Sequence, residues 1–140
     1  MNNGLLSYGS HKAKNPFKEP NTNTMITAKY ESGMDDSPMY EDVPFNKEKN
    51  VMELQDVGLN SLYIADCKAL IKIGKLLNRK AEVKELEERT EYFSNEIEKL
   101  WSEDTGLYLN KCTDTGEFSQ RISPTMFYPL LAEVVSQERA

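Results

Sequence analysis

Residues 54–77 read LQDVGLNSLYIADCKALIKIGKLL, and this stretch decides the fold. Its apolar side chains, placed at about 100° per residue as on a helix, cover nearly the whole circumference. A helix that is apolar all round is buried on all sides. We therefore expect a buried helix over 51–78. Gly58, near its start, either kinks the helix or lets a neighbouring segment approach closely.

The segment that follows, 81–100, has a different pattern. A single apolar stripe recurs every three or four residues, and mostly charged residues fill the remaining positions. This spacing predicts an amphipathic helix that packs one face inward and leaves the other in water. The acidic run 82–91 is then a solvated face. The stripe consists of Val83, Leu86, Thr90, Phe93, Ile97 and Leu100.

The segment 101–122 carries turn signals in place of a helical period. It holds two Asp-Thr-Gly turns, at 104–106 and 114–116. Leu107-Tyr108-Leu109 and Glu117-Phe118 flank the second turn, which predicts a small β-hairpin or a paired extended loop. We therefore expect a loop or hairpin insertion between helices.

A final helix is expected where Ser123 precedes Pro124. Ser is a favourable N-cap, and Pro suits the first helical position. The residues that follow are largely apolar at helical spacing. They predict a strongly apolar helix over 123–137.

The predicted order is inner helix, outer helix, decorated loop and inner helix. It suggests an all-α fold in which an inner ring of buried helices is wrapped by an outer ring of amphipathic ones. Two inner helices and one outer helix cannot close such a ring. Exposed apolar faces on the helices at 51–78 and 124–136 suggest an alternative, a non-catalytic binding or assembly module that pairs with another chain or with itself.

Residues 1–50 show no apolar period of more than a few residues, and Asn and Pro are frequent. Tyr, Met and Phe side chains argue against plain disorder, so we expect an ordered, site-forming loop. Within it, 31–38 reads ESGMDDSP, a poor helix and a poor strand because Gly, Ser, Asp and Pro favour turns. Carboxylates held among Met and Tyr side chains can have a raised pKa, which a general acid needs.

Composition disfavours several classes of partner. The chain has 140 residues and a net charge of -6, without a basic cluster. Nucleic acid and anionic membrane surfaces are therefore poor partners. No run approaches the roughly 20 apolar residues of a membrane span. No signal peptide is visible, which makes the cytoplasm the default location.

One His and two Cys offer little metal or redox chemistry. His11 is expected as an exposed loop side chain, and the absence of a Cys/His cluster argues against a zinc site or another cofactor. Cys67 lies in the apolar helical run and is most simply a small buried hydrophobe. A disulfide between Cys67 and Cys112 stays compatible with the sequence, although no disulfide framework is visible.

Two motifs, YESGMDDSP at 30–38 and DVGLNSL at 56–62, together resemble those of glycoside hydrolase family 63. Its bacterial members include mannosylglycerate hydrolase-like and glucosidase-like enzymes. Trehalases are similar more distantly, with an acidic Glu-Ser-Gly-x-Asp loop and a downstream helix start. The stretch WSEDTGLY at 101–108 is similar to the loop after the outer helix in these enzymes. The resemblance covers residues 4–136.

The resemblance implies an (α/α)6 barrel that hydrolyses α-linked glucosides or mannosides with inversion. It implies that Asp35 is the general acid, that the Gly33 backbone lies against the sugar, and that Glu31 lies beside the same pocket. Inverting enzymes pair the acid with a carboxylate base roughly 6.5–9.5 Å away. In the family this base is a Glu downstream of residue 140. We therefore expect the chain alone to be an inactive part of the domain.

Several side chains near these motifs keep two interpretations. Asp36, where many relatives carry Asn, either raises the pKa of the acid further or points to solvent. Glu31 is either a pocket residue or a structural hydrogen-bonding group. Tyr30 and Tyr40 form either a sugar-stacking wall or part of the core. Asn60 is expected as a helix-start or packing residue rather than a ligand group.

Overall fold

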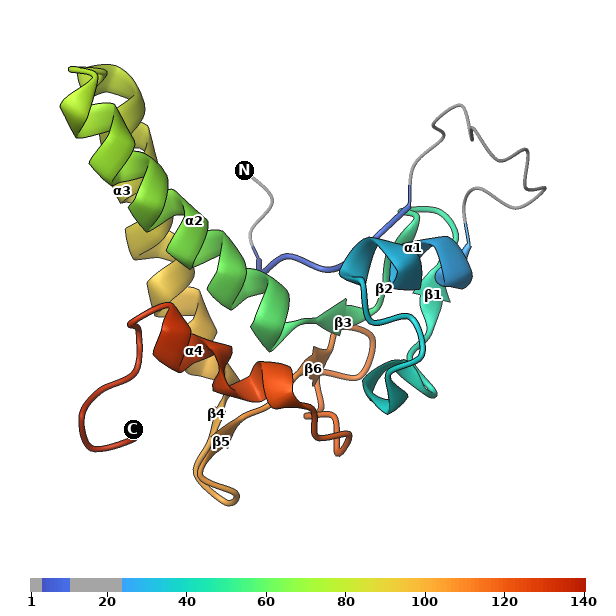
Figure 1. Ribbon diagram of the computed structural model, residues 1–140. Coiled ribbons are helices and arrows are strands. Elements are labelled where there is room, and N and C mark those ends of the chain that lie inside the picture. Colours follow the sequence, from blue (N-terminus) through green and yellow to red (C-terminus); the bar gives the residue numbers. More distant parts are fainter. Residues whose placement is uncertain (1–3, 11–23) are drawn as a thin grey trace.

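The computed structural model describes residues 4–10 and 24–140. Figure 1 shows a long helical hairpin on one side and a smaller lobe on the other, with short strands and the last helix near their common base. Among the described residues the regular structure is mostly helical, and every strand is two residues long.

Both helices of the predicted hairpin are present. α2 is Val57–Leu76 and α3 is Lys80–Ile97, so the two long apolar patterns are confirmed as helices. α2 begins later than predicted because the Asp56 side chain accepts a hydrogen bond in the first turn and caps the helix there. The two helices pack closely at Gly74, where an added Cβ would lie 2.7 Å from Val83 Cγ2.

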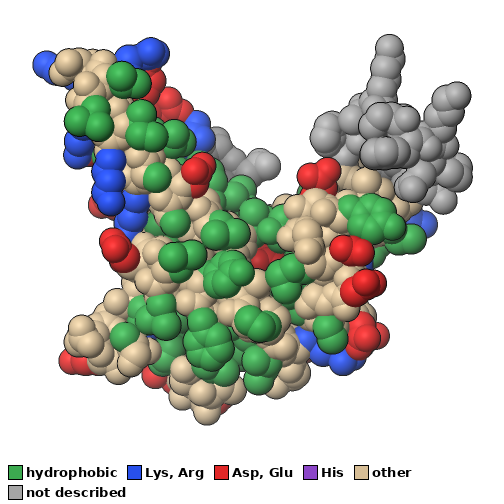
Figure 2. All heavy atoms as spheres, in the orientation of Figure 1, with side chains coloured by type: hydrophobic (Ala, Val, Ile, Leu, Met, Phe, Trp, Pro, Cys, Tyr) green, Lys and Arg blue, Asp and Glu red, His purple; other side chains and the backbone are tan. Residues whose placement is uncertain are grey.

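The prediction that the first helix is buried all round is wrong for α2. One side of it is buried, including Ile64 and Cys67, but Ile73 is 51% exposed and Leu76 is 83% exposed. In Figure 2, apolar side chains form exposed patches along the helical limb. An apolar circumference indicates surfaces that favour burial, and the described part of the chain covers only one side of α2.

The hairpin predicted within 101–122 has the wrong register. β5 (Leu107–Tyr108) pairs with β4 (Trp101–Ser102) around the first Asp-Thr-Gly turn, rather than with 117–118. Gly106 has a φ of 66° in this turn, a conformation that favours Gly. Because the segment holds two identical turn motifs, turn chemistry alone could not select the partner strand.

The strand before the second Asp-Thr-Gly turn pairs with a segment outside 101–122. β6 (Lys111–Cys112) pairs with β3 (Leu54–Gln55), the short strand directly before α2. One isolated bridge joins Lys111 to Phe118 across the turn. The loop is thereby fixed against the start of α2.

The last helix is shorter than predicted. Ser123 caps it as expected, and it runs first as a single 3-10 turn, Pro124–Phe127, and then as α4 (Tyr128–Leu131). The predicted continuation to 137 is wrong, because Glu133 has a φ of 53° and turns the chain. Lys68 Nζ on α2 donates to the Glu133 carbonyl at 3.1 Å, which ties this end to the hairpin.

The segment 1–50 is not all loop, because α1 (Met25–Ser32) lies within it. The Thr24 side chain caps the start of α1, and Gly33 ends it in a left-handed conformation. Ala28 is the buried residue of this helix. A helix with so little buried surface has no apolar stripe that periodicity could detect.

Two clusters of buried side chains hold these elements together. The first lies in the helical part, with Val57, Ile64, Ile97, Leu100, Tyr108 and Ala132. The second lies in the smaller lobe, where β1 (Phe45–Asn46) pairs with β2 (Val51–Met52), and it contains Ala28, Met39, Tyr40, Met52 and Leu54.

The two cysteines are free. Cys67 is buried, which confirms its prediction as a small buried hydrophobe, and Cys112 is half-buried. The disulfide that the sequence left open is therefore not formed.

Asn60 joins the N-terminal segment to α2. It is fully buried, and its Oδ1 accepts from the Leu6 amide at 2.8 Å. Its Nδ2 donates to the carbonyl oxygens of Leu6 at 2.9 Å and of Asp56 at 2.7 Å. The polar atoms of this side chain are therefore hydrogen-bonded to backbone groups, which confirms the expected helix-start role.

We expect Asn60→Ala to lower the free energy of unfolding by about 1–3 kcal/mol, because it leaves the Leu6 amide and carbonyl without their side-chain partner. Urea unfolding followed by circular dichroism measures this change. Asn95→Ala, at an exposed position of α3, is the control and should change the value by less than about 0.5 kcal/mol. Equal effects of the two substitutions would contradict the role of Asn60.

Candidate active site

The acidic loop begins where α1 ends. Gly33 has a φ of 64° and a ψ of 12°, and its amide donates to the Tyr30 carbonyl. A Cβ added to Gly33 would meet no atom within 4 Å. The backbone conformation, rather than a lack of space, therefore favours Gly here. The same open space leaves the Gly33 backbone accessible.

Two serines hold the turn that carries Asp35 and Asp36. Ser32 Oγ accepts from the Met34 amide at 3.0 Å. The Ser37 amide donates to the Met34 carbonyl at 2.9 Å and closes the turn. Asp35 and Asp36 are both exposed at this turn. Their carboxylates are thus presented to solvent on a hydrogen-bonded backbone.

The aromatic residues around the loop have different roles. Tyr40 is buried in the core of the smaller lobe, so for this residue the core interpretation is confirmed. Tyr30 is 55% exposed. Glu31, in the last turn of α1, is also exposed. The Met and Tyr side chains that were expected to surround the carboxylates of the loop thus lie partly in the core and partly in solvent.

A buried acid follows the loop, at Asp56. The Tyr40 hydroxyl donates to Asp56 Oδ2 at 3.2 Å, and Asp56 Oδ1 accepts from the Leu59 amide at 2.8 Å. Asp56 is 2% exposed, and this burial raises the pKa of its carboxyl. Burial, together with the nearby Asp56, raises the pKa of Tyr8 to about 12 and also raises the pKa of Tyr40. An acid directly before an apolar helix is the sequence signal for such a cap.

The first turn of α2 receives two further contacts from distant parts of the chain. Asn110 is fully buried, and its Oδ1 accepts from the Val57 amide at 2.8 Å. A Cβ at Gly58 would lie 2.7 Å from Thr125 Cβ. Of the two roles predicted for Gly58, close approach of a neighbour is therefore confirmed. No local pattern in the sequence identifies Asn110, because its partner is 53 residues away.

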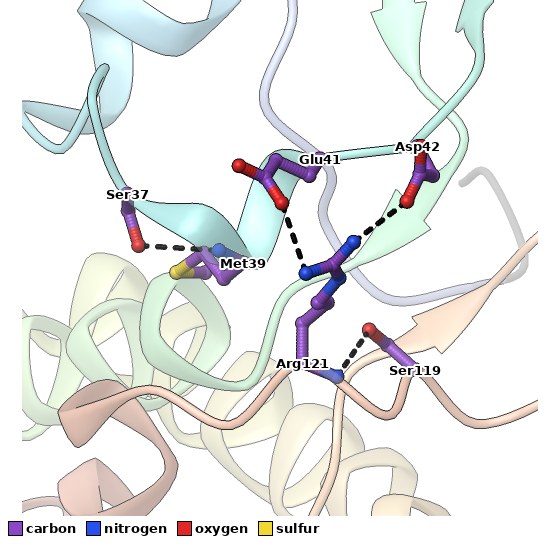
Figure 3. Close-up of polar contacts among 6 residues, drawn as sticks. All are labelled: Ser37, Met39, Glu41, Asp42, Ser119 and Arg121. Carbon is purple, nitrogen blue, oxygen red and sulfur yellow. Dashed lines mark hydrogen bonds and ion pairs between the residues drawn. The ribbon is translucent and has the colours of Figure 1, made fainter.

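Arg121 joins the segment after the acidic loop to the loop after β6. Its guanidinium contacts Glu41 Oε2 at 2.9 Å and Asp42 Oδ2 at 2.8 Å, and its amide donates to Ser119 Oγ at 3.2 Å, as Figure 3 shows. These charged side chains are exposed, so the pairs contribute little to stability. The sequence around Arg121 gives no sign of its pairing either, because Asp42 is 79 residues away.

Other expected features can be placed within the described ranges, 4–10 and 24–140. No group of three or more His, Cys, Asp or Glu side chains there has the arrangement of a metal site. Among these residues, none of the helices has the length and apolar character needed to cross a bilayer. His11, expected as an exposed loop side chain, lies outside the described residues.

Comparison with known proteins identifies a family. Residues 17–140 match the model of the mannosylglycerate hydrolase MGH1-like glycoside hydrolase domain. No match was found among curated proteins.

Solved structures have a similar fold. The GH63 mannosylglycerate hydrolase from Thermus thermophilus in complex with Tris has 27% sequence identity over 61% of this chain and a TM-score of 0.57. The mannosylglycerate hydrolase in complex with glucose has 24% identity over 79% of this chain, with a TM-score of 0.67. An uncharacterized conserved protein from the same organism has 23% identity over 80% of this chain, with a TM-score of 0.68. The chain spans 20%, 34% and 36% of these three chains.

The raised pKa of Asp56 predicts a dependence of stability on pH. The folded chain binds this proton more tightly than the unfolded chain, in which the carboxyl titrates near 3.8. Asp56 therefore costs stability as the pH rises above that value. We expect Asp56→Asn, which keeps a capping side chain, to gain stability relative to the unsubstituted chain between about pH 3 and pH 7. Urea unfolding at several pH values measures the difference.

Asp66→Asn is the control for this experiment, because Asp66 is an exposed acid on the same helix. It should leave the pH dependence almost unchanged. A stability difference between Asp56→Asn and the unsubstituted chain that stays constant with pH would contradict the prediction.

Proposed function

Because the chain belongs to the mannosylglycerate hydrolase MGH1-like glycoside hydrolase domain family, we propose that it is the part of an inverting α-glycosidase that carries the general acid, Asp35. The observation that carries this proposal is the family match over 17–140, which includes the whole acidic loop. The exposure of Asp35 on a hydrogen-bonded turn supports it, because a proton donor must reach the leaving oxygen in a fixed position.

The proposed chemistry needs two carboxyl groups. Asp35 gives its proton to the glycosidic oxygen as the bond to the sugar breaks. A carboxylate base, roughly 6.5–9.5 Å from the acid, removes a proton from the water that attacks the opposite face of the ring. We place this base, a Glu, outside the present chain. The chain then carries half of the catalytic pair and needs no cofactor for it.

Gly33 and Glu31 are proposed to bind the sugar. The space around Gly33 is open, so a substrate can approach its backbone. Glu31 lies two positions earlier, in the last turn of α1, with an exposed side chain. A carboxylate at this position can accept hydrogen bonds from sugar hydroxyl groups. Asp36 is equally exposed and stands directly beside the proposed acid.

We further propose that the chain is a piece of an (α/α)6 barrel, with α2 and α4 in the inner ring and α3 in the outer ring. The uncovered side of α2 supports this arrangement, as does the length of the two GH63 structures, of which the chain spans 20% and 34%. The proposed divisions are a site-forming segment at 1–50, a helix pair at 51–100, an insertion at 101–122 and the next inner helix at 123–137.

The proposed substrate is an α-linked glucoside or mannoside, in an oligosaccharide or a small glycoside. Support comes from two solved structures that are both named mannosylglycerate hydrolase, one of which is described in complex with glucose. Carboxylate chemistry of this kind acts on the glycosidic bond itself. The choice between the two sugars therefore rests on contacts outside the acidic loop.

The exposed apolar side chains favour a second candidate, a non-catalytic module that pairs with another chain to complete a ring. Leu76 on α2 is 83% exposed and Leu131 on α4 is 64% exposed. Apolar surface of this extent is typical of interaction sites. A folded monomer in size-exclusion chromatography would count against this candidate.

In a protein that contains the complete domain, Asp35→Asn should lower kcat for an alkyl α-glycoside by about 10²–10⁴-fold, because the leaving alkoxide then departs without a proton. The loss should be much smaller for a 2,4-dinitrophenyl glycoside, whose leaving group needs no protonation. Steady-state kinetics on the two substrates measures the contrast. Asp36→Asn is the matched control, and equal losses on both substrates would contradict the acid role of Asp35.

The 140-residue chain alone should not hydrolyse trehalose or an aryl α-glucoside, because the proposed base is outside it. A sensitive assay for released glucose or phenol measures this. Hydrolysis by the chain that Asp35→Asn abolishes would refute the expected inactivity, although it would retain the acid role of Asp35.

A further inference from the structure

A groove of about 640 Å³ lies between the N-terminal segment and the helical hairpin. Figure 1 shows the N-terminal segment passing between α2 and the lobe that contains β2. None of the lining residues belongs to the acidic loop at 31–38. Pockets that bind small molecules have volumes of about 300–1,000 Å³. Its apolar lining consists of Leu5, Leu6, Val51, Tyr63, Tyr92 and Phe93.

Three aromatic rings form one wall of the groove. The ring centroids of Tyr63 and Phe93 are 4.7 Å apart, and those of Tyr92 and Phe93 are 5.3 Å apart. Both pairs are T-shaped, so each ring is held in a fixed orientation by its neighbour. Tyr92 is 37% exposed. The wall thus offers rigid aromatic surface to a ligand, of the kind that packs against the C–H groups of a sugar ring.

Charged side chains of both signs also line the groove. Arg89 Nη1 donates to the Tyr63 hydroxyl at 3.1 Å, and the guanidinium also pairs with Glu85. Glu88 lies 3.8 Å from Lys84. A charged ligand would compete with these pairs, whereas a neutral polyhydroxyl ligand can donate to the carboxylates and accept from the guanidinium while the pairs stay formed.

The same charges argue against a purely apolar occupant. Arg89, Glu85 and Lys49 are exposed at present. An apolar side chain or helix that filled the groove would cover their polar atoms without giving them new partners, which is unfavourable. A ligand with apolar ring faces and many hydroxyl groups satisfies the aromatic wall and the charged groups together.

We propose that this groove is a saccharide-binding site for a neutral oligosaccharide, separate from the acidic loop. Leu6 forms part of the groove, and its backbone is bonded to Asn60 in the first turns of α2. The groove is thereby built on the same helix that Asp56 caps. The choice of sugars as ligands agrees with the proposed function and rests on it in part, whereas the shape and lining of the groove do not.

The test is an NMR titration of the 140-residue chain with maltotriose and, separately, with trehalose. We expect saturable shifts at the amides of Leu6, Arg89 and Tyr92. Tyr92→Ala should weaken this binding by about tenfold, because one ring of the wall is lost. Tyr92→Phe, which keeps the ring, should change it much less. Tyr30→Ala, which removes an exposed tyrosine near the acidic loop, is the matched control and should leave it unchanged.

Asp35→Asn separates this proposal from the proposed function. Binding in the groove should be the same in Asp35→Asn, whether or not Asp35 acts as an acid in the complete domain. An absence of shifts in the groove would overturn the proposal. Shifts confined to 31–38 would also overturn it, and so would equal weakening by Tyr92→Ala and Tyr30→Ala. Displacement of a bound apolar dye by peptide but not by either sugar would identify an apolar occupant and overturn it as well.

Discussion

The first turn of α2 is the constraint on which the rest of the structure depends. The side chain of Asp56, directly before the helix, accepts a hydrogen bond from the Leu59 amide. The side chain of Asn110, in the loop after β5, accepts one from the Val57 amide. Asn60, one turn later, holds the N-terminal segment through Leu6. The first amides of a helix have no intrahelical partners. Side chains from distant parts of the sequence can therefore bond to this turn. The acidic loop is joined to it through Tyr40, which bonds Asp56.

Periodicity could predict the helices but not their surroundings. The long apolar patterns of α2 and α3 are local properties, and both helices form. The burial of α2 depends on which neighbours are present, and sequence alone does not give these. The register within 101–122 was predicted incorrectly for a related reason, since its two Asp-Thr-Gly turns are identical in sequence and turn chemistry alone could not select which of them joins 107–108 to a partner strand. α1 was missed because it buries only Ala28.

The candidate site likewise contains some residues that local sequence predicts and others that it does not. Asp35, Glu31 and Gly33 could be named from a short motif, because its residues are adjacent in the sequence. Their proposed roles follow from the family resemblance. The residues that join distant segments around the site could not be found this way. Arg121 and Asn110 act on partners more than 50 residues distant, and a polar residue in a loop gives no local sign of such a contact.

The contact between Gly58 and Thr125 has a consequence for how the sequence can change. An added Cβ at Gly58 would lie 2.7 Å from Thr125 Cβ and 3.2 Å from its Cγ2, so the two positions share a single small volume. A side chain at position 58 is therefore tolerated only together with a change at position 125. Because every residue except Gly keeps a Cβ at 125, a chain with Ala at 58 would need Gly at 125 or a shift of the backbone there. Descendants of this protein should therefore vary at these two positions as a pair, even though neither residue takes part in chemistry.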